Sequence, residues 1–534
     1  MLLLYWLAKV VSSYMLRVFS GELYNQYAIV QSCERSLFKF LNLDENSQNW
    51  KQYLTSLVFL NISLAVFSFI VLVLQNQFAG QARLPVSMLF NILISYTTGT
   101  NWQLFNGGDD VSTLVYTIIT MLNFSSAAIG IAIAVAVVRA IACNTRYPDD
   151  RSFGNFYLDY FRALFLILIP GAIILGSILI LLQVPQTFVN NFSYQNLEAI
   201  NSVLYTGPIA AFEAIKILGV NGGGFFLTNS AHPFENPNIY TNYLHIIGMV
   251  LLPFALLFYY AKSIRRQKHG EMLFFYIWLM LSASALSLAY FEMTASGLPN
   301  FAGKELRFPF EDTILYTSIA ANSSGAAVSD YTMYTTNGVM IILFKLITGS
   351  TLIGGLGTGL LNLILCVLLA VFFTGIMSGR TPEFIGKKVN ALAIKLIAYY
   401  YLVSQGVILV FIAISLYYFA DTIAATSKGL IDFFFLYTST FFNNGSGYGE
   451  FYKNSTWVNL STSFIMLFGR FFITIIMFVI ANELSKTKAR ERSLDKTDIH
   501  TPFFMFIITF VILNNILPFV PLFVLSPISS IVAG

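Results

Sequence analysis

The sequence predicts an all-α membrane protein that crosses the bilayer ten times. Of the 534 residues, 56% are apolar and only 10% are charged, whereas a soluble domain carries roughly 25% charged residues. The chain also contains ten apolar runs long enough to cross the hydrocarbon core of a bilayer. A soluble globule is therefore excluded, and lipid must cover much of the apolar surface.

The ten apolar runs are predicted as membrane spans. They cover residues 2–19, 54–74, 111–138, 161–182, 243–261, 273–292, 338–377, 396–419, 460–481 and 503–525. The run at 338–377 is too long for one crossing, because a straight helix of that length would measure ~60 Å, and a glycine-rich stretch at 349–359 interrupts it. The first run has no basic residue before it and no cleavage pattern of small residues, so we expect it to remain as a span.

Basic residues predict the orientation of these spans. Roughly two-thirds of the Lys and Arg residues lie in five connecting segments, which the positive-inside rule places in the cytoplasm. These segments are at about 20–54, 139–156, 262–271, 380–395 and 485–501. Both termini are then expected outside the membrane of a bacterial cell.

Several function classes have little support in the sequence. The formal net charge is only +4 and the basic residues are scattered, which argues against nucleic-acid binding. The three cysteines lie far apart, so neither a disulfide framework nor a zinc site is indicated. The GGLGTG stretch at 354–359 follows no predicted strand, and the sequence DKTD at 495–498, although similar to a P-type ATPase phosphorylation site, lies in a loop too short for a nucleotide domain. We expect no catalytic site and no bound nucleotide in this chain.

Four of the outer segments contain an apolar stretch too short to span the bilayer, which we interpret as a re-entrant helix. The four short helices are predicted at Met88–Tyr96, Pro208–Leu218, Phe310–Ala320 and Leu430–Thr440. Each leads into a cluster of Gly, Asn and Ser. These clusters are called here the first to fourth polar segments, and they cover residues 97–103, 220–226, 322–327 and 443–449.

The polar segments also define an internal repeat. Their centres, taken as Asn101, Gly222, Ser324 and Gly445, recur about every 100–120 residues. The chain then forms one membrane domain with a leading span at 2–19 and a trailing span at 503–525. Between them lie four repeats of span, short helix, polar segment and span, at 54–138, 161–261, 273–377 and 396–481.

Four such segments predict an ion filter. Irregular backbone at membrane depth is tolerated only where protein buries it or where it lines a water-filled cavity. Glycine lets successive carbonyls face one side, four converging strands can replace the hydration shell of an alkali cation, and the negative helix ends favour a cation further. Since the segments hold no Asp or Glu at their centres, potassium is favoured over a divalent ion. A single cluster of this kind is usually a plain turn, and the hypothesis depends on having four.

The candidate filter residues are taken from the centres of the four polar segments. They are Thr98, Gly99, Thr100, Asn101, Val220, Asn221, Gly222, Gly223, Asn322, Ser323, Ser324, Gly325, Asn443, Asn444, Gly445 and Ser446.

Further motifs carry two interpretations each. The glycines Gly354, Gly355 and Gly357 in the long seventh run are a candidate gate, or a simple kink. Arg470 lies inside a predicted span, where a charge is costly and often functional, so it is a candidate barrier in the ion path, or a structural cation. Lys345 is a weaker candidate for the same path. Glu213 and Lys216, three residues apart, are interpreted as a helix-stabilising pair.

The sequence resembles the potassium-binding membrane subunit of the bacterial Kdp potassium-transporting ATPase over nearly its whole length. The strings that carry the resemblance are NWKQYL (49–54), TNWQ (100–103), EAIK (213–216), LGVNGGGFFLTNSAHPFENP (218–237), GGLGTGL (354–360), SGRTPEFIGKK (378–388), NNGS (443–446), GRF (469–471) and HTP (500–502). The resemblance implies a fold related to potassium channels and Trk-type transporters. It also implies that the chain binds extracellular potassium and passes it to a P-type ATPase partner, together with small accessory membrane subunits.

Four positions depart from the family pattern. Gly99 stands in place of Asn, Val220 in place of Thr and Ser324 in place of Cys, and Ser350 stands where the pattern has an acidic residue. The first three leave the backbone carbonyls in place, so they bear on affinity rather than on the filter itself. The alternative function is a self-sufficient potassium channel or Trk-type transporter, which would conduct without an ATPase.

Overall fold

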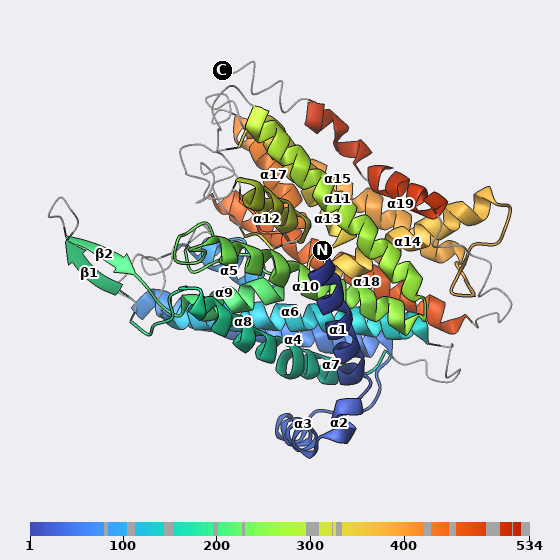
Figure 1. Ribbon diagram of the computed structural model, residues 1–534, viewed down its shortest axis with the longest axis horizontal. Coiled ribbons are helices and arrows are strands. Elements are labelled where there is room, and N and C mark those ends of the chain that lie inside the picture. The colour runs from blue at the N-terminus through green and yellow to red at the C-terminus, as the bar shows by residue number, and fades with distance from the viewer. Residues whose placement is uncertain are drawn as a thin grey trace.

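Helices make up most of the computed structural model of the chain, as the sequence predicts (Figure 1). The structure describes residues 1–78, 84–103, 113–143, 153–189, 191–195, 201–226, 230–294, 309–322, 324–326, 334–420, 429–447, 455–487, 502–514 and 516–524. Within these ranges, nine helical stretches are long and apolar enough to cross a membrane. The predicted multi-pass membrane protein is therefore supported by the helix lengths as well as by composition.

The first half of the chain holds the following elements: α1 (Leu2–Phe19), α2 (Glu22–Gln26), α3 (Ala28–Leu41), α4 (Trp50–Phe78), α5 (Val86–Thr97), α6 (Thr113–Ala142), α7 (Phe156–Arg162), the π-helix η1 (Ala163–Leu168), α8 (Ile169–Leu181), β1 (Asn191–Gln195), β2 (Asn201–Tyr205), α9 (Ile209–Gly219) and α10 (Ile239–Ser263).

The second half holds α11 (Gln267–Thr294), α12 (Pro309–Asn322), α13 (Thr336–Leu352), α14 (Thr358–Met377), β3 (Glu383–Phe384), β4 (Lys387–Lys388), α15 (Ala391–Tyr418), α17 (Gly429–Phe441), α18 (Thr456–Lys486), α19 (Pro502–Asn514) and the 3-10 turn η4 (Leu517–Phe519).

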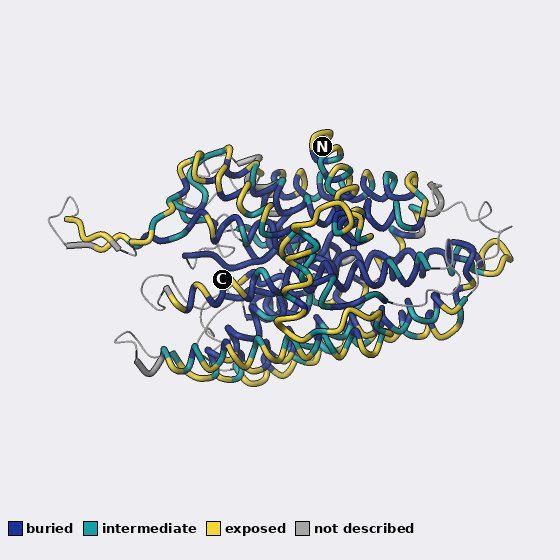
Figure 2. Tube along the Cα trace, turned by 90° about the horizontal axis from the view of Figure 1, so that it is seen from below, coloured by how far each residue is buried: buried dark blue, intermediate teal, exposed yellow. Residues whose placement is uncertain are grey.

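The long helices alternate between outer and inner positions along the chain. Outer helices α4, α7–α8, α11 and α15 bury only 17–44% of their most apolar stretch, whereas inner helices α6, α10, α14 and α18 bury 61–89%. The exposed side chains of the outer helices are largely apolar, as on α4, where Phe59 and Ile62 are more than half exposed. A surface of this kind is suited to lipid. Figure 2 shows the same division, with buried residues through the middle of the molecule and exposed residues along its outer helices.

A helix occupies each of the four places where the sequence predicts a short one: α5, α9, α12 and α17. Each packs against a helix of another predicted repeat: α9 against α6, α12 against α10, α17 against α13, which is the first part of the long seventh run, and α5 against α18. The contacts therefore run in a closed circuit around the centre of the molecule. Asn91 on α5 strengthens one of them, because its amide donates to the Asn459 carbonyl and the Thr462 hydroxyl of α18, both at 2.8 Å.

The long seventh run is two helices, α13 and α14, separated by a break at 353–357. Gly354 and Gly357 there have left-handed backbones, with φ of 55° and 86°. The predicted interruption is thus present, but it is narrower than 349–359 because α13 continues through Leu352. The predicted last span at 503–525 contains α19 and η4, and part of it lies outside the described residues.

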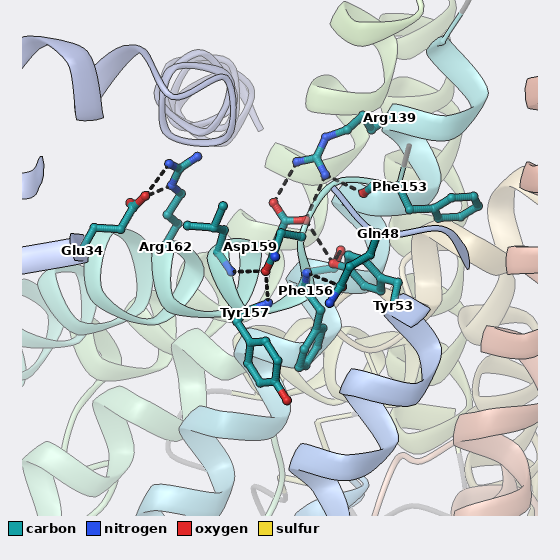
Figure 3. Close-up of polar contacts among 12 residues, drawn as sticks. Glu34, Gln48, Tyr53, Arg139, Phe153, Phe156, Tyr157, Asp159 and Arg162 are labelled. Atoms are coloured by element: carbon teal, nitrogen blue, oxygen red, sulfur yellow. Dashed lines mark hydrogen bonds and ion pairs between the residues drawn. The ribbon is translucent and has the colours of Figure 1, made fainter. Parts of the chain in front are cut away.

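Two predicted connecting segments have regular structure that hydropathy does not indicate. The segment at 20–54 contains α2 and α3, and the outer segment after α8 contains the antiparallel hairpin β1–β2, which projects from one end of the bundle (Figure 1). Ion pairs join α3 and α6 to α7 (Figure 3): Arg162 contacts Glu34 at 2.7 Å, and Arg139 contacts Asp159 at 2.8 Å. The Tyr53 hydroxyl also donates to Asp159, at 3.1 Å.

Candidate ion site at the four polar segments

The four polar segments begin at the C-terminal ends of the short helices and turn sharply through left-handed backbone. Residues in this conformation are Gly99 (φ 70°), Asn101 (55°), Val220 (54°), Gly223 (74°), Gly325 (60°), Asn443 (53°) and Gly445 (83°). This conformation costs residues with a Cβ about 1 kcal/mol or more and is otherwise uncommon. Each of the four segments therefore contains at least one left-handed turn, although the spacing of these residues differs between segments.

The segments meet each other through glycines that leave no room for a side chain. A methyl group added at Gly445 would lie 1.9 Å from the Thr100 carbonyl oxygen, and one at Gly325 would lie 2.4 Å from the Asn444 carbonyl oxygen. A methyl group at Gly222 would lie 2.5 Å from the Ser324 carbonyl oxygen. The second segment therefore abuts the third, the third abuts the fourth, and the fourth abuts the first.

Side chains close the remaining side, between the first and second segments. The Gly224 amide donates to the side-chain oxygen of Gln103 at 2.7 Å. A methyl group at Gly223 would lie 2.6 Å from the Tyr96 hydroxyl. The structure thus brings the candidate filter residues of all four segments into one ring, except Ser323, which lies outside the described residues.

The close contacts also fix the register of the third segment. Gly325 abuts the fourth segment just as Gly222 abuts the third and Gly445 abuts the first. The predicted centre at Ser324 is therefore one residue early, and Ser324 instead supplies the carbonyl that faces Gly222. Ser and Gly both suit turns, so the one-residue offset could be detected only from contacts between segments.

Backbone carbonyls and a few amide side chains are the polar groups at the ring. The carbonyl oxygens of Thr100, Ser324 and Asn444 lie at the contacts between segments. The buried side chains of Asn101 and Ser324 have no hydrogen-bond partner in the described part of the chain. Oxygens of this kind, without a carboxylate, are the ligands of a dehydrated alkali cation.

Hydroxyl groups hold the first and fourth segments from within. Ser95 donates to the Trp102 carbonyl at 3.0 Å, and Ser439 donates to the Ser446 carbonyl at 2.8 Å. Both bonds join a serine near the end of a short helix to the carbonyl seven residues later. Neither serine is among the candidate residues expected from the sequence, although both lie six residues before a segment centre, at Asn101 and Gly445.

Asparagine side chains of the segments donate to backbone carbonyls of the inner helices and so anchor the segments to the bundle. Asn221 donates to the Asn123 carbonyl of α6 at 2.8 Å, and Asn322 donates to the Met249 carbonyl of α10 at 3.2 Å. Asn443 donates to the Met466 carbonyl of α18 at 3.0 Å and to the Thr100 hydroxyl at 2.8 Å. Asn221, Asn322 and Asn443 therefore bind the surrounding helices through their side chains.

The predicted pair of Glu213 and Lys216 is present on α9, with a 2.6 Å contact between two fully buried groups. Ser230 contacts both partners. A third charged group, Glu235, is also fully buried and accepts backbone N–H groups from the end of the second polar segment. Glu235 is not among the candidate residues expected from the sequence, and acidic residues are seldom fully buried.

The break between α13 and α14 lies against both α6 and the fourth polar segment. A methyl group at Gly357 would lie 2.0 Å from the Gly130 carbonyl oxygen of α6. Gly354, Gly355 and Thr358 also line a small cavity with Asn443 and Gly469. The candidate gate residues are therefore next to the ring in space, although about 90 residues separate them from the fourth segment.

The two buried cations of the candidate path occupy different surroundings. Arg470 is 7% exposed, donates to the Ser126 carbonyl of α6 at 3.2 Å, and lies 3.1 Å from where a methyl group at Gly130 would sit. It is thus close to the α13–α14 break. Lys345 donates to the Met280 carbonyl on the outer helix α11 at 3.2 Å, an arrangement that a structural cation would also have.

A family model described as potassium-transporting ATPase A subunit matches residues 1–532. Similar curated proteins carry the name potassium-transporting ATPase potassium-binding subunit. One from Caldanaerobacter subterraneus subsp. tengcongensis is 33% identical over 98% of this chain and 96% of its own length. One from Alicyclobacillus acidocaldarius is 34% identical over 97% and 95%, and one from Rhizobium rhizogenes is 31% identical over 99% and 96%.

Among solved structures, the potassium transporter TrkH from Vibrio parahaemolyticus has a similar fold. The TM-score is 0.55 at 14% identity, and the match covers 89% of this chain and 97% of TrkH. At this identity the likeness is one of fold alone. It identifies the helical arrangement as Trk-like.

Proposed function

This chain belongs to the family of potassium-transporting ATPase A subunits, and from that membership we propose that it binds and selects extracellular potassium and delivers it to a P-type ATPase partner for ATP-driven import. The single observation that carries the proposal is the ring of four polar segments, in which Gly222, Gly325 and Gly445 each abut a carbonyl of the next segment. In this proposal potassium is the transported ion.

The ring supports potassium selection through backbone chemistry. The four short helices end at the ring, so the negative ends of their dipoles face the ion. Backbone carbonyls replace its hydration shell, and the tight contacts between segments limit how far the ring can shrink around a smaller ion. The candidate filter residues of the sequence analysis are proposed as the ligand set, with Gly325 as the centre of the third segment.

The four repeats and ten spans are part of the proposal. The alternation of outer and inner helices and the circuit of short-helix contacts support four equivalent units. The distribution of Lys and Arg supports both termini outside a bacterial plasma membrane. We propose the same partners as the resemblance implies, a catalytic ATPase subunit and small accessory membrane subunits.

The ion path below the ring is proposed to pass the α13–α14 break. Gly354, Gly355 and Gly357 provide its flexible backbone, and Arg470 places a positive charge beside it, which opposes free passage of cations. The contacts of Arg470 with α6 and of the break with Gly130 support this placement. Lys345 is retained as a weaker candidate.

Reconstitution of the chain with and without its partners tests the function. We expect tagged chain from its native host to co-purify with a P-type ATPase, and the ATPase activity of that complex to depend on potassium. In liposomes, the chain alone is expected to show no robust potassium flux. Robust flux without ATP or partners would instead establish the alternative, a self-sufficient channel or Trk-type transporter, for which the family gives less support.

A further inference from the structure

Glu235 is a buried carboxylate that binds backbone at the end of the second polar segment. It lies between α9 and α10 and is fully buried. One carboxylate oxygen accepts the amides of Phe225 at 2.6 Å and Phe226 at 3.2 Å, and the other accepts the Ser230 amide at 2.8 Å. Three hydrogen bonds from backbone amides to one buried carboxyl group hold this stretch of backbone in place.

The backbone that Glu235 holds continues directly from the ring. Gly223 has a left-handed φ of 74°, and the next amide, of Gly224, is held by Gln103. The Phe225 carbonyl in turn accepts a 2.7 Å hydrogen bond from the Tyr116 hydroxyl on α6. Three consecutive amides and one carbonyl are thus bound by side chains from other elements, which fixes the direction in which the preceding carbonyls point.

A buried pair of charged residues, Glu213 and Lys216, is joined to Glu235 through Ser230. Ser230, whose amide Glu235 binds, also contacts the Glu213 carboxylate at 3.3 Å and the Lys216 ammonium. Lys216 pairs with Glu213, and its own carbonyl accepts the Asn221 amide at 3.0 Å. The cluster therefore lies beside the second segment: Lys216 is on the helix that leads into it, and Glu235 binds its end at Phe225 and Phe226.

We propose that Glu235 is a positioning residue for ion selection: it does not touch the ion, but it sets the geometry of the second segment of the ring. The inference rests on the proposed function, since it concerns the same ring. It follows that a change at Glu235 shifts ion affinity and ion ranking, whereas a merely structural carboxylate would affect only yield and stability.

The test uses the assembled complex and compares Glu235→Gln with two other variants. Gln keeps one acceptor oxygen but turns an amide toward a backbone N–H, so we expect the potassium half-saturation of the ATPase to rise roughly tenfold, about 1.4 kcal/mol. We also expect rubidium to compete better against potassium, with the maximal rate changed by less than about twofold. Tyr116→Phe keeps the aromatic side chain but removes the hydroxyl that binds the Phe225 carbonyl. We expect it to raise the potassium half-saturation about two- to threefold.

Glu292→Gln is the matched control. Glu292 is equally buried and accepts the Thr335 amide at 3.1 Å and the Thr335 hydroxyl at 2.6 Å, at the start of α13 and outside the polar segments. We expect it to keep the parental half-saturation and ion ranking. An equal shift in Glu292→Gln would overturn the inference.

The remaining outcomes also decide the matter. One outcome is a Glu235→Gln complex that assembles and keeps the parental potassium half-saturation and the parental ranking of potassium over rubidium. That result overturns the inference and leaves the proposed function intact. If Glu235→Gln does not assemble, Tyr116→Phe decides, and parental behaviour there overturns it equally. A wild-type complex whose ATPase activity ignores potassium would overturn the proposed function itself.

Discussion

The second and fourth polar segments occupy equivalent places in the ring, but different side chains hold them. The backbone N–H of Asn221 donates to the Lys216 carbonyl at 3.0 Å, and the backbone N–H of Asn444 donates to the Ser439 carbonyl at 2.8 Å. Lys216 and Ser439 therefore occupy corresponding positions. The Ser439 hydroxyl then donates to the Ser446 carbonyl in the segment that follows its helix. Lys216 instead points to Glu213 and Ser230, and the second segment is held from outside.

This difference in supporting side chains predicts which of the two segments tolerates substitution better. The fourth segment is held by neutral bonds from Ser439, Asn443 and Asn444, each of which contributes roughly 1 kcal/mol. The second segment depends on three fully buried charges, and removing one partner of a buried pair leaves an uncompensated charge. The second segment should therefore be the more rigid of the two and the more sensitive to substitution.

Removal of Lys216 is expected to have the largest effect. Lys216→Met leaves Glu213 and Glu235 without a cation inside the protein, so we expect the free energy of unfolding to fall by about 3–5 kcal/mol and little complex to assemble. The measurement is the yield and thermal unfolding of the purified complex. The double variant Glu213→Gln, Lys216→Met should be milder than the single one, and a single variant with parental stability would contradict the account of the cluster.

Serine at the ring glycines is expected to change ion selection. Gly222→Ser brings its Cβ within 2.5 Å of the Ser324 carbonyl, and strain at such a site costs on the order of 1–3 kcal/mol. We expect Gly222→Ser to lower discrimination of potassium from rubidium, sodium and ammonium more than it lowers yield. Gly445→Ser should be worse, since its backbone is also left-handed and its Cβ would lie 1.9 Å from an oxygen.

The control for both glycine variants is Gly406→Ser on α15, because in the described part of the chain no atom beyond its own helix lies within 4 Å of a Cβ there. Competition among the four ions in ATPase stimulation measures the outcome. Parental ion ranking and half-saturation in Gly222→Ser would remove Gly222 from the filter.

The second and fourth polar segments also differ in where a buried cation lies, before the segment at Lys216 and after it at Arg470. Arg470 has a backbone carbonyl as its partner, so its loss leaves no buried carboxylate behind. We expect Arg470→Gln to assemble normally and to raise passive potassium leak roughly tenfold, a barrier reduction of about 1.4 kcal/mol. Flux through the reconstituted complex without ATP measures this, and unchanged leak with unchanged transport would make Arg470 a structural cation.

The smallest effect is expected at Ser439. Ser439→Ala removes one neutral bond to the Ser446 carbonyl, worth about 1 kcal/mol, while Asn443 and Asn444 still hold the segment. We expect the potassium half-saturation to rise by less than about fivefold with unchanged assembly. An effect of Ser439→Ala larger than that of Lys216→Met would reverse the proposed difference between the two segments.

The sequence by itself determined the elements that depend on local pattern. Long apolar runs specify spanning helices because the backbone must bond within the helix in lipid, and shorter runs such as Met88–Tyr96 and Leu430–Thr440 correspond to α5 and α17 within two residues. The glycine-rich interruption of the seventh span was visible for the same reason. The polar segments could be located, because Gly and Asn are the residues that suit left-handed turns.

The tertiary structure alone decided how these elements meet. The register of the third segment depends on Gly325 facing the fourth segment, and the hold on Gly224 depends on Gln103, about 120 residues away in the chain. Glu235 is buried where the amides of Phe225, Phe226 and Ser230 satisfy its carboxyl oxygens. Such choices depend on long-range contacts and on the cost of burying a charge, which hydropathy, composition and local turn preference do not encode.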